Sequence, residues 1–347
     1  MSLTVLSVAY PLAPVSPALA GGAEQILLQL DRALQQAGHR SLVIACAGSE
    51  ISGQLIACPP VPALLDDDAR RDAQRANAEL IHRAIAVEPV DVVHMHGVDF
   101  HCYLPDAGPP VLVTLHLPLS CYPPEMLAPS RPRTWLHCVS AAQHATRPAD
   151  ARFLPPIGNG VEVPAATRRR RGPYCLFLGR ICPEKGVHLA ILAAKLARLP
   201  LIIAGTLFPY PEHLKYFSEQ IKPQLGDDCR FVCNAGPEMR LELLENARCL
   251  LIPSLIEETS SLVAREALAA GAPVVAFRRT ALVELIENGR TGFLVNSPEE
   301  MAEAIASSSR IDGSDCQEFA RRNFPLEKMT SEYLRLYQQI ASGQVCC

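Results

Sequence analysis

The sequence predicts an α/β protein made of two doubly wound parallel-sheet units in tandem. Short apolar runs alternate with helical patterns from residue 4 to residue 140, and the same alternation restarts at residue 174. Between them, residues 155–173 are rich in proline, glycine and arginine, which is typical of an interdomain linker. Regular alternation of strand and helix indicates a mostly parallel sheet with helices on both faces. A chain of 347 residues is long enough for two such domains.

The first unit is expected to span residues 1–160. One helix, 21–38, opens on Gly21-Gly22, has apolar residues at helical spacing and stops at Gly38. A second helix is expected over 69–88. Strands are expected where short apolar runs occur, over 4–10, 39–47, 90–97, 111–116 and 134–140.

The second unit is expected to span residues 161–325, with residues 326–347 forming a final helical segment. Its predicted strands are 174–180, 199–205, 229–236, 249–254 and 273–277. The predicted helices are 186–198, 211–222, 239–247, 261–270, 301–309 and 326–341. In sheets of this kind, ligands bind outside the carboxyl ends of the strands, so the functional residues are expected at those ends.

Composition excludes several classes of protein. The formal net charge is −4, and residues 1–160 contain no lysine, so neither nucleic acid nor anionic lipid is an expected partner. The thirteen cysteines are scattered without a Cys-x-x-Cys pair, which indicates reduced thiols and a cytoplasmic location. The N-terminus reads as a strand instead of a signal peptide, and no apolar run reaches the roughly 18 residues of a membrane span.

The familiar phosphate-binding motifs of α/β proteins are absent. No Gly-x-Gly-x-x-Gly follows a strand, and there is no Walker A loop. Asp66-Asp67-Asp68 contains an Asp-x-Asp pattern that can hold a metal-bound sugar diphosphate. Because it precedes a predicted helix, helix capping is the favoured interpretation.

Three histidines lie at the ends of predicted strands. His94 and His96 are two residues apart and so face the same side of their strand, but a metal pair there lacks a third ligand nearby in sequence. His116 ends the next strand. A hydrogen-bonded structural role and a functional role at the edge of the sheet both remain open for it.

The loop after strand 174–180 carries two cations, Arg180 and Lys185. Arginine binds phosphate oxygens as a fork and lysine adds a compact charge, so this loop suits a diphosphate. A surface salt bridge between Lys185 and Glu184 is the alternative. The helix start at Gly21-Gly22 is a second, weaker anion-binding candidate.

Glu258 and Glu266 form the most informative pair. Glu258 falls in a strand-to-helix turn and Glu266 falls along the following helix, offset by about 80° if the span were helical throughout. This separation disfavours the paired carboxylates of a glycoside hydrolase. The N–H groups of Ser260, Ser261 and Leu262 begin the helix between them and are predicted to face a diphosphate. A purely structural alternative makes Glu258 a cap partner and pairs Glu266 with an arginine.

Residues 253–277 resemble the Glu-x7-Glu segment of retaining glycosyltransferases of family 4, which have the GT-B fold. The first glutamate of the motif is Glu258, because the residue eight positions after Glu257 is Arg265. The resemblance extends in order through 21–39, 91–97, 111–116, 157–163, 178–191 and 284–295. It implies two Rossmann-like domains facing across a cleft, an N-terminal one that binds the acceptor and a C-terminal one that binds the donor. The final helix would cross back to the N-terminal domain.

The resemblance also implies roles for individual residues. Arg180 and Lys185 would bind the diphosphate of a donor linked to UDP or GDP, and Gly22 would lie near the phosphate or the acceptor. Glu266 would bind the ribose and Glu258 the transferred sugar, with His116 beside the anomeric carbon or the outer sugar hydroxyls. Many relatives have Gly-Phe-Gly where this chain has Thr259-Ser260-Ser261, so the geometry of the sugar contact is expected to differ here.

The implied activity is transfer of a sugar from a nucleoside diphosphate sugar to an acceptor hydroxyl with retention at the anomeric carbon. No metal and no cofactor would be needed, because the cations and the helix start would neutralise the leaving diphosphate. The acceptor would be a small molecule, a glycan or a lipid-linked glycan. A sugar-nucleotide epimerase of the same fold and a non-catalytic nucleotide-sugar binding protein are the alternatives.

Overall fold

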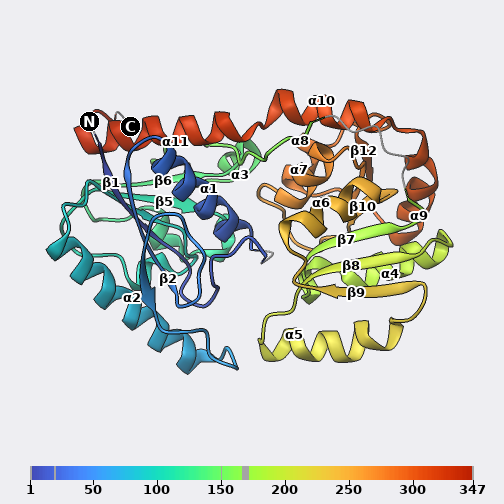
Figure 1. Ribbon diagram of the computed structural model, residues 1–347, viewed down its shortest axis with the longest axis horizontal. Helices are drawn as coiled ribbons and strands as arrows, with labels where there is room; N and C mark the ends of the chain where they lie inside the picture. Colours follow the sequence, from blue (N-terminus) through green and yellow to red (C-terminus); the bar gives the residue numbers. More distant parts are fainter. Residues whose placement is uncertain (1, 19–20, 150, 166–171, 346–347) are drawn as a thin grey trace. The chain divides into compact units, whose positions relative to one another are not determined.

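The structure is a computed structural model that describes residues 2–18, 21–149, 151–165 and 172–345. The chain forms two compact units (Figure 1). Unit 1 comprises Met1–Pro17, Gly21–Asn159 and Glu327–Cys347, and unit 2 comprises Ala18–Ala20 and Gly160–Leu326. The final helix is therefore part of the same compact unit as the N-terminal sheet. The arginine run 168–171 of the expected linker lies outside the described residues.

Unit 1 is built on a six-stranded parallel sheet in the order β3-β2-β1-β4-β5-β6. Its strands are β1 (Thr4–Val8), β2 (Arg40–Cys46), β3 (Gln54–Cys58), β4 (Val92–Met95), β5 (Val111–Leu115) and β6 (Thr134–Cys138). Its α-helices are α1 (Gly22–Gln36), α2 (Asp67–Val87), α3 (Ala141–Ala145) and α11 (Leu326–Ser342). The 3-10 turns are η1 (Phe100–Cys102), η2 (Leu119–Cys121) and η3 (Pro124–Leu127).

Unit 2 repeats this topology with a second six-stranded parallel sheet, in the order β12-β11-β10-β7-β8-β9. Its strands are β7 (Cys175–Arg180), β8 (Leu201–Thr206), β9 (Cys229–Cys233), β10 (Cys249–Ile252), β11 (Val274–Phe277) and β12 (Gly292–Val295). Its α-helices are α4 (Val187–Leu196), α5 (Pro211–Tyr216), α6 (Pro237–Asn246), α7 (Leu262–Ala269), α8 (Thr280–Leu285), α9 (Pro298–Ser307) and α10 (Gly313–Asn323). Short turns complete it: η4 (Pro183–Lys185), η5 (Phe217–Ile221), η6 (Lys222–Gln224) and η7 (Ser308–Arg310).

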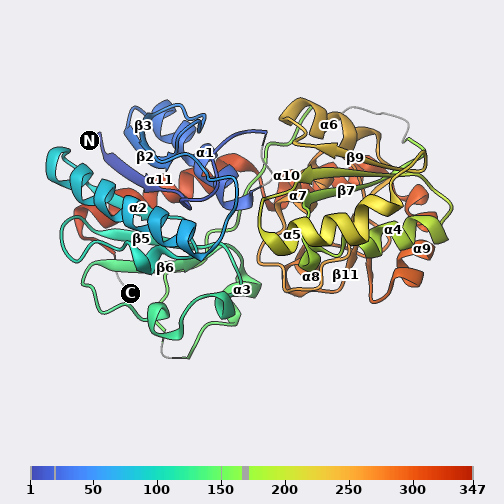
Figure 2. The same ribbon diagram turned by 90° about the horizontal axis from the view of Figure 1, so that it is seen from below.

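Alternate residues of the central strands of unit 2 enter two separate cores, as the period of two in a β-strand requires. Leu176 and Leu250 pack with α6, α7, α8 and α10 on one face. Cys175 and Leu251 pack with α4, α5 and α9 on the other. Both faces of the sheet are therefore covered by helices, which explains why its strands read as continuous apolar runs. Figure 2 shows the sheet of unit 2 from a second side.

In unit 1 the same alternation sends successive residues of β4 to opposite faces of the sheet. Val93 and Met95 of β4 enter the core beside α2. The alternate residue His94 instead bonds to Tyr337 of α11 on the other face. The final helix thus covers a row of buried histidines. In the sequence Val-His-Met-His, the apolar residues face one side of the sheet and the histidines face the other.

Most of the predicted elements are present with their ends shifted by a few residues. The edge strands β3 and β12 and the helices α3, α8 and α10 were not predicted. β3 has mostly half-exposed or exposed side chains, so it lacks the apolar run that identified the central strands. The helix expected over 211–222 ends as an α-helix at Tyr216 and continues through the π-helical turn η5. The cap expected at the start of α2 is confirmed, because the Asp66 carboxylate accepts a hydrogen bond from the Ala69 N–H at 2.9 Å.

Candidate functional site

The order of strands in unit 2 reverses between β7 and β10. Such a switch point leaves a crevice outside the carboxyl ends of the two strands, where open α/β sheets bind ligands. The chain that leaves β7 carries Arg180 and Lys185, and the chain that leaves β10 carries Glu258 and the start of α7. The fold therefore brings the two sequence-predicted segments to the same place.

A direct ion pair joins these two segments. The Lys185 Nζ lies 2.6 Å from the Glu258 Oε1, and both side chains are largely buried. The Leu255 N–H also donates to the Glu184 carbonyl at 2.8 Å, which ties the backbones together. The salt bridge of Lys185 with Glu184, which the sequence left open, is not the pairing found.

Gly186 makes this close approach possible. Its φ of 67° is in the left-handed region, and a Cβ at this position would lie 2.2 Å from the Pro253 carbonyl oxygen. Any other residue would combine backbone strain with a backbone clash. A glycine directly after Lys185 is thus required to bring the lysine against Glu258.

Of the two adjacent glutamates, Glu258 is the buried one. Burial alone would raise its pKa, but the Lys185 ammonium, a hydrogen bond from Ser254 and the Arg180 charge together hold the pKa below its usual value. Glu257 is exposed and accepts a hydrogen bond from the Thr280 N–H at 2.9 Å, at the start of α8. Glu258 therefore pairs with Lys185 between the two segments, whereas Glu257 points to α8.

Arg180 ends β7, with its side chain about one-third exposed. Its Nη2 lies 4.0 Å from the Glu184 Oε1, a loose contact that leaves most of the guanidinium able to bind another anion. Arg180 and Lys185 therefore flank the loop as predicted, each with an acidic neighbour of its own.

The start of α7 faces the crevice with an unusual backbone. Ser261 precedes the first helical residue, Leu262, and adopts φ 47° and ψ 74°, a left-handed conformation that favours glycine. It occupies the last position of the stretch in which many relatives have Gly-Phe-Gly. The hydroxyls of Ser260 and Ser261 are buried without a hydrogen-bond partner in the described part of the chain. Both are therefore available to donate to an anion at the helix start.

Glu266 lies on α7 with part of its surface exposed. Burial raises the pKa of its carboxyl, and the charge of Arg240 opposes that rise. Within the described ranges its carboxylate forms no ion pair with an arginine, so the structural alternative for this residue is not supported. Glu258 likewise does not act as the side-chain cap of α7.

Arg265, next to Glu266, is a supporting residue that the sequence interpretation missed. It is buried, its Nε donates to the Ser260 carbonyl at 3.1 Å, and its guanidinium carbon lies 4.8 Å from the centre of the Phe324 ring. Burial lowers its pKa to about 10, which still leaves it charged. Arg265 holds the turn before α7 in place. The available signal was a second charged residue, beside Glu266, on a helix whose other residues are apolar.

The switch point of unit 1 lies between β1 and β4, and its predicted residues are Gly22 and His116. Gly22 is exposed and begins α1, the helix that follows β1. His116 follows β5, and its Nε2 lies 3.0 Å from the Nδ1 of His96. Burial lowers the pKa of His116 to about 3, so the imidazole is neutral at pH 7 and acts through hydrogen bonds.

His116 belongs to a larger histidine cluster on the α11 face, formed by His94, His96, His116 and His137. The rings of His94 and His96 lie 3.9 Å apart, which confirms that the two share one face of β4. Burial lowers the pKa of His137 to about 4, and it also lowers the pKa values of His94 and His96 well below the usual value. All four imidazoles are therefore neutral near pH 7.

Hydrogen bonds fix the proton positions in this cluster. His137 Nδ1 lies 3.1 Å from the Cys138 carbonyl and must carry a proton, so its Nε2 accepts from the Thr114 hydroxyl at 2.7 Å. Thr114 then accepts from His94 Nε2 at 2.7 Å. The remaining nitrogen of His94, Nδ1, accepts from the Tyr337 hydroxyl at 2.7 Å. The metal pair considered for His94 and His96 is thus replaced at His94 by a hydrogen-bonded chain.

Two Rossmann-like units in one chain, each built on a six-stranded parallel sheet, define the GT-B class of fold. Structures of this class match nearly the whole chain. They include AviGT4, a glycosyltransferase involved in avilamycin A biosynthesis (TM-score 0.71, 23% identity, 98% of each chain). Another is Anabaena HepE in complex with UDP-glucose (TM-score 0.74, 18% identity, 97% of this chain and 100% of the other). At these identities the likeness shows the fold.

The family follows from the sequence. A model described as Glycosyltransferase Family 4 matches residues 20–153, and one described as Glycosyl transferases group 1 matches residues 172–309. Together they span most of the chain, which belongs to the family-4 type of glycosyltransferase.

Curated relatives are distant or matched in part. The lipopolysaccharide 1,2-N-acetylglucosaminetransferase of Salmonella typhimurium is 30% identical over 40% of this chain, and the match spans only 37% of that protein. The phosphatidyl-myo-inositol mannosyltransferase of Mycolicibacterium smegmatis is 27% identical over 96% of this chain and 94% of its own length. No described helix is both long and apolar enough to cross a membrane.

Proposed function

We propose that this protein is a retaining glycosyltransferase that moves a sugar from a nucleoside diphosphate sugar to an acceptor hydroxyl without a catalytic metal. The observation that carries the proposal is the Lys185–Glu258 pair, 2.6 Å apart at the switch point of the second sheet and beside the start of α7. Cation, carboxylate and helix N-terminus there match a diphosphate joined to a sugar.

Each residue has a separate task in the proposed reaction. Arg180, Lys185 and the N–H groups at the start of α7 bind the diphosphate and stabilise the negative charge that develops on it. Glu266 accepts hydrogen bonds from the ribose hydroxyls, and Glu258 accepts them from the transferred sugar. His116, which is neutral, hydrogen bonds near the reacting carbon.

The bond from the anomeric carbon to the diphosphate oxygen breaks, and a bond to the acceptor oxygen forms on the same face of the sugar. The acceptor proton passes to the leaving diphosphate oxygen. No carboxylate nucleophile is required by this route, which suits the use of Glu258 as a sugar ligand paired with a lysine.

The donor base and sugar are to be found by experiment, and UDP- and GDP-linked sugars are the first to screen. UDP-glucose leads the series because HepE was solved in complex with it. A bound donor stabilises the folded protein by mass action, so thermal shifts rank the candidates before any acceptor is known.

The test combines two variants with a surface control. Lys185→Ala is expected to lower transfer about 100-fold, the scale seen when one charge-stabilising group is removed. Glu266→Ala is expected to lower transfer by weakening donor binding, because its hydrogen bonds to the ribose are lost. Lys195→Ala, at an exposed position on α4, is the matched control and should retain activity. Transfer that persists undiminished in both site variants would contradict the assignment.

The product identifies the type of enzyme. An anomeric configuration in the product equal to that of the donor supports retention. Appearance of an epimerised nucleotide sugar without acceptor would instead identify an epimerase. Donor binding without turnover across small-molecule, glycan and lipid-linked acceptors would identify a binding protein.

A further inference from the structure

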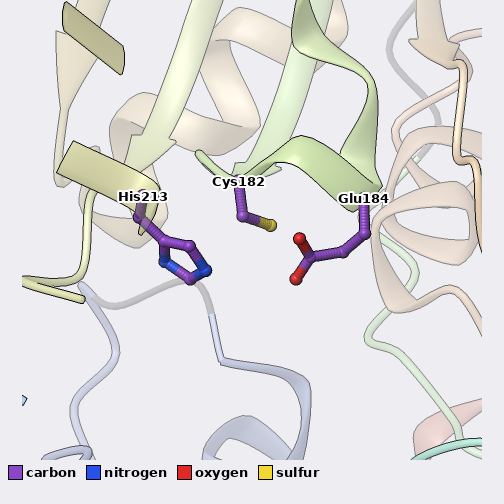
Figure 3. A group of neighbouring side chains, drawn as sticks. All are labelled: Cys182, Glu184 and His213. Carbon is purple, nitrogen blue, oxygen red and sulfur yellow. The ribbon is translucent and has the colours of Figure 1, made fainter. Parts of the chain in front are cut away.

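Three metal-ligating side chains converge in unit 2 beside the loop that carries Arg180 and Lys185. They are Cys182, just after β7, Glu184 of η4 and His213 of α5, and their ligand atoms all lie within 4.8 Å of one another. Figure 3 shows the thiol between the imidazole and the carboxylate, with all three side chains directed to a common space. Two of the three come from one loop, and the third comes from a helix that follows the next strand.

The His213 imidazole is the poorly satisfied member of this cluster, whereas the Cys182 thiol and the Glu184 carboxylate hydrogen bond to each other. His213 is 5% exposed, and its Nδ1 is buried without a hydrogen-bond partner among the described residues. Cys182 is fully buried, and its thiol makes a weak contact of 3.8 Å with the Arg180 carbonyl. A buried imidazole nitrogen without a partner costs free energy unless something else binds it.

The donor set selects a class of ion. Thiolate, imidazole and carboxylate together are ligands of zinc, whereas magnesium and calcium prefer oxygen alone. A thiolate and a carboxylate balance the charge of a divalent ion, and the neighbouring cation is Arg180, 4.0 Å from Glu184.

The spacing is close to that of a bound site. Zinc–sulfur and zinc–nitrogen bonds of about 2.3 and 2.0 Å place tetrahedral ligands roughly 3.5 Å apart. The present limit of 4.8 Å therefore requires a contraction of about 1 Å, within reach of the rotatable Glu184 side chain. The thiol of Cys182 would lose its proton on binding, and a water molecule would complete the four ligands.

We propose that Cys182, Glu184 and His213 form a zinc-binding site that joins α5 to the loop after β7. The ion takes no part in sugar transfer. It draws Glu184 away from Arg180 and fixes the segment from which Lys185 projects. This site is independent of the proposed function, because it uses none of the residues assigned to the donor or the acceptor.

Cobalt, a spectroscopic substitute for zinc, tests the proposal in the full-length protein under reducing conditions and without nucleotide. The wild type is expected to bind one equivalent with thiolate-to-cobalt charge-transfer absorption, which zinc then abolishes by displacement. Cys182→Ala should lose that absorption. Glu184→Gln and His213→Gln should weaken binding at least about tenfold, since even loss of an outer-shell partner costs about 10–100-fold.

Cys233→Ser is the matched control, because this thiol is exposed in the same unit. It should bind cobalt as the wild type does. Glu184 is only half-buried on η4, so Glu184→Gln keeps the test usable if a variant at a fully buried ligand does not fold. Circular dichroism of each metal-free variant establishes folding. Charge-transfer absorption that survives Cys182→Ala, or equal affinity in Glu184→Gln and the wild type, would overturn the site.

Discussion

Lys185 and Glu258 are 73 positions apart in the sequence, yet their Nζ and Oε1 atoms lie 2.6 Å apart. The pair joins the loop after β7 to the segment that begins α7. In the proposed reaction, a diphosphate that binds Lys185 would compete with Glu258 for the same ammonium group. The Glu258 carboxylate would then be released to accept hydrogen bonds from the sugar when the donor binds.

Removal of one partner of this pair should destabilise unit 2. Lys185→Met leaves the Glu258 carboxylate buried without its cation, which is expected to cost about 3 kcal/mol of unfolding free energy. The double variant Lys185→Met with Glu258→Gln should recover part of this loss. Chemical denaturation measures both. Arg290→Met is the control because the Arg290–Glu287 pair is nearly half exposed, and it should cost much less. Equal losses for Lys185→Met and Arg290→Met would show that the buried pair has no special weight.

Gly186→Ala should impair both stability and donor binding. The substitution adds strain at φ 67° and places a Cβ 2.2 Å from the Pro253 carbonyl oxygen. Gly289→Ala is a matched control for the backbone term, because Gly289 has φ 79° with no atom within 4 Å of a Cβ. We expect Gly289→Ala to cost about 1 kcal/mol and Gly186→Ala clearly more. Chemical denaturation measures the stability of each variant, and donor-induced thermal shifts measure its donor binding. Equal values for Gly186→Ala and Gly289→Ala would contradict the conclusion that the backbone at residue 186 must lie against Pro253.

Local patterns predicted the central strands and the loops at the switch point, because each rests on neighbouring residues. The Lys185–Glu258 pair was not predicted, since nothing local relates residues so distant in sequence. Arg265 was missed because its partners, the Ser260 carbonyl and the Phe324 ring, are set by the turn and by the end of α10. The edge strands β3 and β12 lack long buried runs, and sequence periodicity identifies such strands poorly.

Ser261 should show a reversed preference between glycine and alanine. At an ordinary helical position alanine is favoured by about 1 kcal/mol. At φ 47°, however, alanine retains the strain of the left-handed region and glycine does not. Ser261→Gly is therefore expected to be more stable than Ser261→Ala by about 1 kcal/mol. The exposed Ser331 of α11 provides the control, where alanine should exceed glycine. Denaturation measures the stability of all four variants. If the alanine variant were the more stable one at Ser261 as well as at Ser331, the backbone at Ser261 would not be strained.

The histidine cluster should make stability fall in mild acid. Burial holds the pKa of His116 at about 3 and that of His137 at about 4, below the usual 6.5, and lowers those of His94 and His96 as well. Below about pH 6.5 the histidines of the unfolded chain therefore bind protons, whereas the same histidines in the folded protein do not. The stabilisation is complete above pH 6.5 and is lost as the pH falls toward 4, by up to about 1.4 kcal/mol per pH unit for each histidine.

Denaturation midpoints between pH 7 and pH 4 measure this slope. His94→Gln should reduce the slope of unfolding free energy against pH by an amount that corresponds to at most one bound proton. His82→Gln, at an exposed position on α2, should leave that slope unchanged. A wild-type slope unchanged by His94→Gln would assign the acid sensitivity to other groups.

Tyr337 and Tyr333 should contribute unequally to holding α11 on the sheet. The Tyr337 hydroxyl is the donor to His94 Nδ1 at 2.7 Å, and Tyr337→Phe leaves that buried nitrogen without a partner at a cost of about 1–3 kcal/mol. Tyr333→Phe removes a longer contact of 3.3 Å to Thr114. The Thr114 hydroxyl still accepts from His94 and donates to His137, so this variant should lose less unfolding free energy. Both variants delete one buried hydroxyl from the same helix, which makes them matched controls in a denaturation experiment. In the proton positions derived for the cluster, the Tyr337 hydroxyl is the only donor to His94 Nδ1 among the described residues. A larger loss of stability in Tyr333→Phe than in Tyr337→Phe would show that those proton positions are wrong.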